Sequence, residues 1–175
     1  MDDIVKQAMR KWPNVPNCFG WLGLDKRGNW YLRDEATQAQ GDFPASKGSL
    51  VEHDKLLGFI GRNYDVDSEG RWYFQNGPQR VYVELEETPW VLRVAMDGFT
   101  TTHTGEKFVP QRCLMDELGH VYLAADKTLG IVHTQDVHEV ANALEAGVWP
   151  LENVIRADLE SRYGFQRHPK KSAEI

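Results

Sequence analysis

The amino-acid sequence predicts an α+β fold, in which a mostly antiparallel β-meander carries helices at both ends and one inserted helix. Apolar and polar residues alternate through much of residues 65–133, which is the period of a half-buried strand. Near both ends of the chain, apolar residues recur at helical spacing instead. A turn motif occurs three times, as expected where short hairpins join the strands.

The repeated motif is Asp-x-x-Gly-x-x-Tyr, at residues 25–31, 67–73 and 116–122. Asp at the first position of a type I turn accepts backbone hydrogen bonds, and Gly at the fourth position adopts a left-handed conformation at no steric cost. Random placement would give only about 0.04 copies in a chain of this composition. The uneven spacing of the copies opposes a solenoid, so we expect three similar hairpins within one domain.

The N-terminal third is expected to hold two helices. Apolar residues at helical spacing over residues 4–12 predict the first, which Pro13 ends. Residues 33–48 are polar and glycine-containing, so we expect a loop there. Ser49 followed by Glu52 is a capping-box pattern, which predicts the inserted helix.

The central meander is predicted from residue 65 to residue 133. Strands are expected over residues 72–74 and 81–85, joined by an Asn-Gly-Pro turn. The strand over residues 90–96 leads into Asp97-Gly98, a pair typical of a type I′ hairpin.

The C-terminal part of the chain is expected to pair the strands over residues 121–123 and 131–133 and then to turn helical. Asp136 with Glu139 forms a capping box before a helix that ends at Gly147. A last helix is expected over residues 151–163. Residues 1–165 are thus interpreted as one α+β domain, and the polar residues 166–175 as a disordered tail.

Bulk composition excludes several classes of protein. The 175 residues are 41% hydrophobic and 26% charged, as in a soluble globular protein. No apolar run is long enough to span a membrane, and the N-terminus lacks the features of a signal peptide, so a cytoplasmic location and no membrane partner are expected. The net charge of −6 argues against a nucleic-acid partner. The two cysteines favour free thiols over a disulfide.

The candidate ligand-binding residues come from the repeated motif and the arginines beside it. In each predicted strand the tyrosine faces away from its apolar neighbours, which share the opposite face. These tyrosines could form an aromatic platform for a ligand, a peptide or a single-stranded base. The favoured alternative is that each packs under a helix with its hydroxyl hydrogen-bonded. The candidate residues are Tyr31, Tyr73, Tyr122, Arg33, Arg71 and Arg80.

Metal and catalytic signatures are incomplete. Residues 65–76 begin like a calcium loop but end in Asn76, which cannot supply the bidentate carboxylate, so no metal site and no cofactor are predicted. A hydrolase-like pocket could use His103, His120 or His133 with a carboxylate, but no spacing among them is specific. Cys113 lies in no nucleophile motif. No catalytic residue is assigned.

Three segments resemble an uncharacterised proteobacterial family of similar length. They are KWPNVP at residues 11–16, GWLGLD at residues 20–25 and the run over residues 70–83, and the resemblance extends over nearly the whole chain. It implies no activity and no site residue.

Taken together, these features favour a cytoplasmic binding or interaction module with an unknown protein or small-molecule partner. A small hydrolase-like enzyme, with its pocket between sheet and helices, is the alternative. A single-stranded nucleic-acid binder is a second alternative. The oligomeric state stays open.

Overall fold

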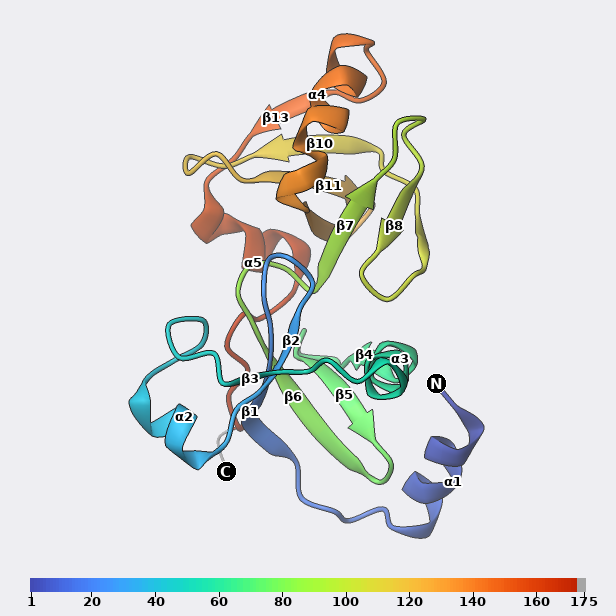
Figure 1. Cartoon of the computed structure of the whole chain (residues 1–175), viewed down its shortest axis with the longest axis vertical. Helices are drawn as coiled ribbons and strands as arrows, with labels where there is room; N and C mark the ends of the chain where they lie inside the picture. The colour runs from blue at the N-terminus through green and yellow to red at the C-terminus, as the bar shows by residue number, and fades with distance from the viewer. Residues whose placement is uncertain (173–175) are drawn as a thin grey trace. The chain divides into compact units, whose positions relative to one another are not determined.

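The computed structural model of the chain describes residues 1–172, and they divide into two compact units. The first unit holds residues 1–25, 29–86 and the described residues from 166 onward, and the second holds residues 26–28 and 87–165. The α+β class is confirmed, but a mixed sheet in each unit replaces the single, mostly antiparallel meander (Figure 1). The single-domain expectation stays a prediction, because a division by contacts does not show whether either unit folds alone.

The first unit is built on a six-stranded sheet in the order β3-β2-β1-β6-β5-β4. All of its neighbouring strands are antiparallel except β1 and β6, which run parallel with Leu22 opposite Val83. The helices of this unit are α1 (Asp3–Lys11), α2 (Glu35–Gln40) and α3 (Asp54–Arg62). Its strands are β1 (Cys18–Leu24), β2 (Trp30–Leu32), β3 (Ser49–Leu50), β4 (Tyr64–Val66), β5 (Trp72–Asn76) and β6 (Gln79–Leu85).

The second unit is built on a seven-stranded sheet in the order β13-β10-β11-β12-β7-β8-β9, in which β13 runs parallel to β10 and β7 to β12. Val140 of α4 is buried with Leu92, Leu123 and Trp149 in the core of this unit. The helices are α4 (Val137–Glu145) and α5 (Leu159–Tyr163), each preceded by a short 3₁₀ turn. The strands are β7 (Trp90–Val94), β8 (Thr100–Thr102), β9 (Lys107–Phe108), β10 (Arg112–Met115), β11 (Val121–Ala125), β12 (Thr128–Val132) and β13 (Leu151–Asn153).

Two expectations for the N-terminal third are wrong. Residues 33–48 are not a plain loop, because they contain α2, whose first turn is capped by Asp34 accepting from the Thr37 amide at 2.8 Å. The inserted helix does not begin after Ser49, which lies in β3. It begins after His53, whose ring nitrogen accepts from the Leu56 amide.

The C-terminal elements also differ from expectation. Leu151 opens β13, paired with Cys113, so the predicted helix over residues 151–163 is reduced to α5. Asp136 does not cap α4 with its side chain, because its carboxylate accepts from Arg93 and from the Val94 amide.

The hairpin after β7 is not of type I′, which needs a positive φ at both central residues. Gly98 has a φ of +83°, but Asp97 does not share the positive φ. The Gly98 amide donates to the Ala95 carbonyl and the Ala95 amide to the Phe99 carbonyl, which is a type I turn followed by a bulge.

The polar tail, whose disorder stays a prediction, makes backbone hydrogen bonds in its described part. The Gln166 amide donates to the Gly70 carbonyl at 2.9 Å, and the Leu85 amide donates to the Arg167 carbonyl at 2.8 Å. Arg167 is buried. Residues 166–172 are thus packed within the first unit, and residues 173–175 lie outside the described residues.

Candidate ligand-binding site

Each copy of the repeated motif joins two antiparallel strands, and its aspartate binds both the turn and a tyrosine. In the third copy, Asp116 accepts from the Leu118 and His120 amides at 2.9 Å and from the Tyr122 hydroxyl at 2.7 Å. In the first, Asp25 accepts from the Asn29 amide at 2.9 Å and from the Tyr31 hydroxyl at 3.2 Å. The tyrosine hydroxyls are thus used within the fold.

The middle copy uses a different tyrosine. Asp67 accepts from the Tyr82 hydroxyl at 2.8 Å, and Tyr82 lies opposite Tyr73 on the neighbouring strand. Tyr73 and Tyr122 are buried, whereas Tyr31 is partly exposed. Burial, together with the hydrogen bond to Asp116, raises the pKa of Tyr122 well above its usual value. Their part in ligand binding stays a prediction, and Tyr122 lies in the other unit from Tyr31 and Tyr73.

Of the three candidate arginines, Arg33 fixes the segment that contains α2. Its guanidinium donates to the carbonyls of Gly20, Gly41 and Ser46 at 2.8, 2.9 and 3.1 Å. Only 4% of Arg33 is exposed, so its charge is satisfied within the fold.

Arg71 and Arg80 lie close to the aromatic side chains of β5 and β6. The Arg80 guanidinium lies 3.9 Å from the centre of the Tyr73 ring, and that of Arg71 lies 4.7 Å from the Tyr82 ring. Arg71 also forms an ion pair with Asp67 at 2.8 Å. The structure therefore brings Tyr73, Arg71 and Arg80 together on one face of the first sheet.

The opposite face of the same sheet carries an apolar groove of about 490 Å³. Because side chains alternate along a strand, Phe74 and Asn76 point away from Tyr73 and into this groove. Leu56 and Ile60 of α3 form one side of it. Its remaining lining residues are Cys18, Trp21, Leu22, Leu32, Arg33, Asp34, Gln79 and Val81.

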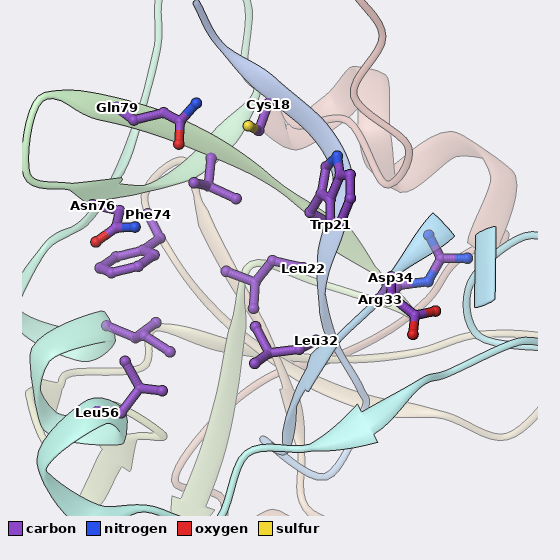
Figure 2. Close-up of a pocket in the computed structure, with 12 residues that line it drawn as sticks. Cys18, Trp21, Leu22, Leu32, Arg33, Asp34, Leu56, Phe74, Asn76 and Gln79 are labelled. Carbon is purple, nitrogen blue, oxygen red and sulfur yellow. The ribbon is translucent and has the colours of Figure 1, made fainter. Parts of the chain in front are cut away.

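Figure 2 shows how the groove is arranged, with Phe74 and Leu56 on one side of the opening and Leu22 and Leu32 on the other. Leu22 and Ile60 are each 1% exposed, whereas Leu32 is 50% and Trp21 42% exposed. The groove thus has a closed apolar base and an open edge where large apolar side chains meet solvent.

Polar groups are confined to the rim of the groove. Asp34 accepts from the Thr37 amide, and this hydrogen bond lowers the pKa of its carboxyl. Gln79 donates to the Pro16 carbonyl at 3.1 Å, and Asn76 is exposed. With Arg33 engaged by three carbonyls, the rim offers amides and one carboxylate. This arrangement suits binding rather than acid-base chemistry.

The histidines that could serve a hydrolase each have a different partner in the second unit. His120 Nδ1 lies 2.8 Å from Asp116 Oδ2, while Nδ1 of His103 and of His133 accept from the Val91 and Gln135 amides. Within residues 1–172, no group of three His, Cys, Asp or Glu side chains is placed to hold a metal ion.

The groove residues were missed in the sequence because strands far apart in the chain assemble them. Cys18 lies opposite Val81 in the parallel pair of β1 and β6, and no local turn signal announces that pairing. Part of the signal was visible, since the sequence places Phe74 on the strand face opposite Tyr73.

Fold and site define an α+β protein of two sheet-based units, the first of which carries an apolar groove of ligand size. The chain belongs to the family described as "Protein of unknown function (DUF2946)", whose model matches residues 1–170. This confirms the resemblance to an uncharacterised family, and it brings no activity with it.

Two solved structures are similar to the chain. One, from Silicibacter pomeroyi DSS-3, is a DUF1285 family protein with 14% identity, a TM-score of 0.49, and coverage of 81% of this chain and 84% of its own. The other, a DUF1285 family protein from Shewanella baltica OS155, has 13% identity, a TM-score of 0.44, and coverage of 70% and 91%. No curated protein is significantly similar to the chain. None of the helices in residues 1–172 has the length and apolar character needed to cross a membrane.

Proposed function

We propose that this protein is a binding module that takes a small, uncharged and mainly apolar ligand in the groove beside α3. The observation that carries the proposal is the groove itself, an apolar hollow of about 490 Å³ on a pre-formed sheet. Small-molecule sites are typically apolar hollows of about 300–1,000 Å³ with few polar groups. The groove falls within that range.

The rim argues for an uncharged ligand. The only guanidinium in the lining, that of Arg33, already donates to three carbonyls. The Asp34 carboxylate at the same end disfavours an anion. Asn76 and Gln79 can hydrogen-bond one polar end of a ligand whose apolar body covers Leu32 and Trp21.

The proposal is tested by titrating the full chain with N-phenyl-1-naphthylamine, an uncharged apolar probe that fluoresces when it leaves water. We expect saturable binding, weakened about tenfold or more by Leu32→Glu, because a carboxylate at the groove edge opposes burial of an apolar probe. Leu118→Glu is the matched control, since Leu118 is 66% exposed and lies in the second unit.

Cys18 supplies a second measurement of the same groove. Its thiol is in the lining, so a bound probe should slow the reaction of Cys18 with a thiol reagent. Saturable binding that Leu32→Glu leaves unchanged, or the absence of any binding, would contradict the proposal.

A further inference from the structure

A second hollow, of about 340 Å³, lies against the hairpin of β5 and β6 on the face that Gln75 and Arg80 share. Its other wall is the chain that follows α1, including Trp12 and Pro13. Gln79 holds this chain to the hairpin by donating to the Pro16 carbonyl. The hollow belongs entirely to the first unit, and the groove described above lies on the other face of β5.

The aromatic surface of this hollow is Trp12. Its side chain is 51% exposed, and Lys11 Nζ lies 4.6 Å from the centre of its ring. A large exposed aromatic ring at a hollow can be covered by a planar apolar group, which stacks on it. The ring of a ligand is therefore expected to lie on Trp12.

The cationic group of the hollow is Arg80. Its guanidinium stacks on Tyr73 and, within residues 1–172, makes one long hydrogen bond, from Nη1 to the Tyr82 hydroxyl at 3.4 Å. No carboxylate of the described chain pairs with it. A planar fork with donors to spare matches a carboxylate, and Lys11 adds positive charge beside Trp12.

The buried acceptor of the hollow is Gln75. Its Nε2 donates to the Gly77 carbonyl at 3.0 Å, which sets the orientation of the amide, while Oε1 is buried and has no hydrogen-bond partner among residues 1–172. An unpaired buried acceptor costs free energy that a donor can recover. Because Oε1 is buried, a donor reaches it only when a partly exposed side chain of the lining, such as Met9, moves aside while Trp12 stays in place.

We propose that this hollow binds a small aromatic acid. The planar ring stacks on Trp12, the carboxylate pairs with Arg80, and a ring N–H or O–H donates to Gln75 Oε1. Each of the three groups recognises a different part of the ligand, so each can be tested by removing that part.

The ligand side of the test is a calorimetric titration of the full chain with three probes. Indole-3-acetate has the ring, the donor and the carboxylate, 1-naphthaleneacetate lacks the donor, and 3-methylindole lacks the carboxylate. We expect indole-3-acetate to bind most tightly and each of the others about tenfold more weakly, since each loses one hydrogen-bonded contact to a buried or charged group.

The protein side of the test uses Gln75→Met and Arg80→Met. Gln75→Met should abolish the preference for indole-3-acetate over 1-naphthaleneacetate. Arg80→Met should abolish the preference for indole-3-acetate over 3-methylindole. Gln40→Met, at an exposed position of the first unit that lines neither hollow, should change neither preference. The three probes discriminate in the wild-type chain even where a variant fails to fold.

Three results would overturn the proposal. The first is that none of the three probes binds. The second is that indole-3-acetate binds no better than the other two probes. The third is that indole-3-acetate displaces N-phenyl-1-naphthylamine from the groove, which would place it in the wrong site.

Discussion

The Tyr82 hydroxyl donates to Oδ2 of Asp67 at 2.8 Å, although Tyr82 lies on the strand after the one that follows this turn. In the other two turns, the corresponding oxygen accepts from the tyrosine six residues further along, Tyr31 or Tyr122. Tyr73 occupies that position after Asp67 but makes no hydrogen bond to it within residues 1–172. In this turn the hydrogen bond to the aspartate is therefore made by Tyr82, the cross-strand neighbour of Tyr73.

This exchange predicts opposite outcomes for two conservative substitutions. Tyr82→Phe leaves a partly buried carboxylate short of one donor, and should lower the free energy of unfolding by about 1.5–3 kcal/mol. Tyr73→Phe should change it by less than about 0.5 kcal/mol, because the ring stays in place under Arg80. Urea unfolding of both variants is the measurement, and equal losses would contradict the assignment.

The elements that the sequence predicted well are those specified by neighbouring residues. β5 and β6 were expected because alternation and an Asn-Gly-Pro turn lie within one short stretch, and Phe74 does pair with Val81. The pairing of β11 with β12 was visible for the same reason, with Tyr122 opposite Ile131. Turn chemistry and strand period act over a few residues and can be interpreted in a single chain.

The elements that could not be predicted depend on residues far apart in the chain. The parallel pairing of Leu22 with Val83 splits the expected meander, and no local pattern encodes it. Asp136 looked like a helix cap, but a distant partner, Arg93, takes its carboxylate. The groove could not be foreseen either, since α3 and four strands must assemble before its lining exists.

Asp116 should make the stability of the chain sensitive to acid. Burial alone would raise the pKa of its carboxyl, but hydrogen bonds from Tyr122 and His120 outweigh burial and hold the pKa below its usual value of 3.8. A carboxyl whose pKa is lower in the folded than in the unfolded state stabilises the fold fully at pH values above the pKa of the unfolded state. This stabilisation is lost as the pH falls through the pKa that the carboxyl has in the folded state.

Asp116→Asn is therefore expected to lower the free energy of unfolding by about 2 kcal/mol at pH 7. The difference in free energy of unfolding between the variant and the wild type should become smaller below pH 3.8. Asp42→Asn, at an exposed position of the first unit, is the control and should cost little at either pH. Urea unfolding at several pH values measures both. If the difference in free energy of unfolding between variant and wild type grew as the pH was lowered, the assigned direction of the pKa shift of Asp116 would be wrong.

The two cysteines should differ sharply in reactivity. Cys113 is fully buried in the second unit, and burial raises the pKa of its thiol to about 11, so little thiolate is present and no reagent reaches it. Cys18 is partly exposed and lines the groove. We expect Ellman's reagent to modify only Cys18 in the native chain and both thiols in urea. Cys18→Ser should abolish the native reaction, and a native reaction that survives it would contradict the assignment.

Two glycine-to-alanine substitutions should act in opposite directions. A Cβ on Gly23 would lie 2.5 Å from the ring of Phe43, which is 2% exposed and cannot move aside freely. Gly23→Ala should therefore cost about 1–3 kcal/mol, as overpacking of a core does. A Cβ on Gly58, within α3, meets only the flexible end of Arg62 at 3.1 Å.

Gly58→Ala should consequently stabilise the chain by about 0.5–1 kcal/mol, the gain from replacing glycine inside a helix. Thermal and urea unfolding of the two variants provide the measurement, with each serving as the control for the other. Both substitutions add the same methyl group. A change in the free energy of unfolding that has opposite signs in the two variants therefore reflects the different surroundings of that methyl group. If Gly23→Ala left the free energy of unfolding unchanged, Phe43 would have room to shift. That result would contradict the inference that its ring packs closely on β1.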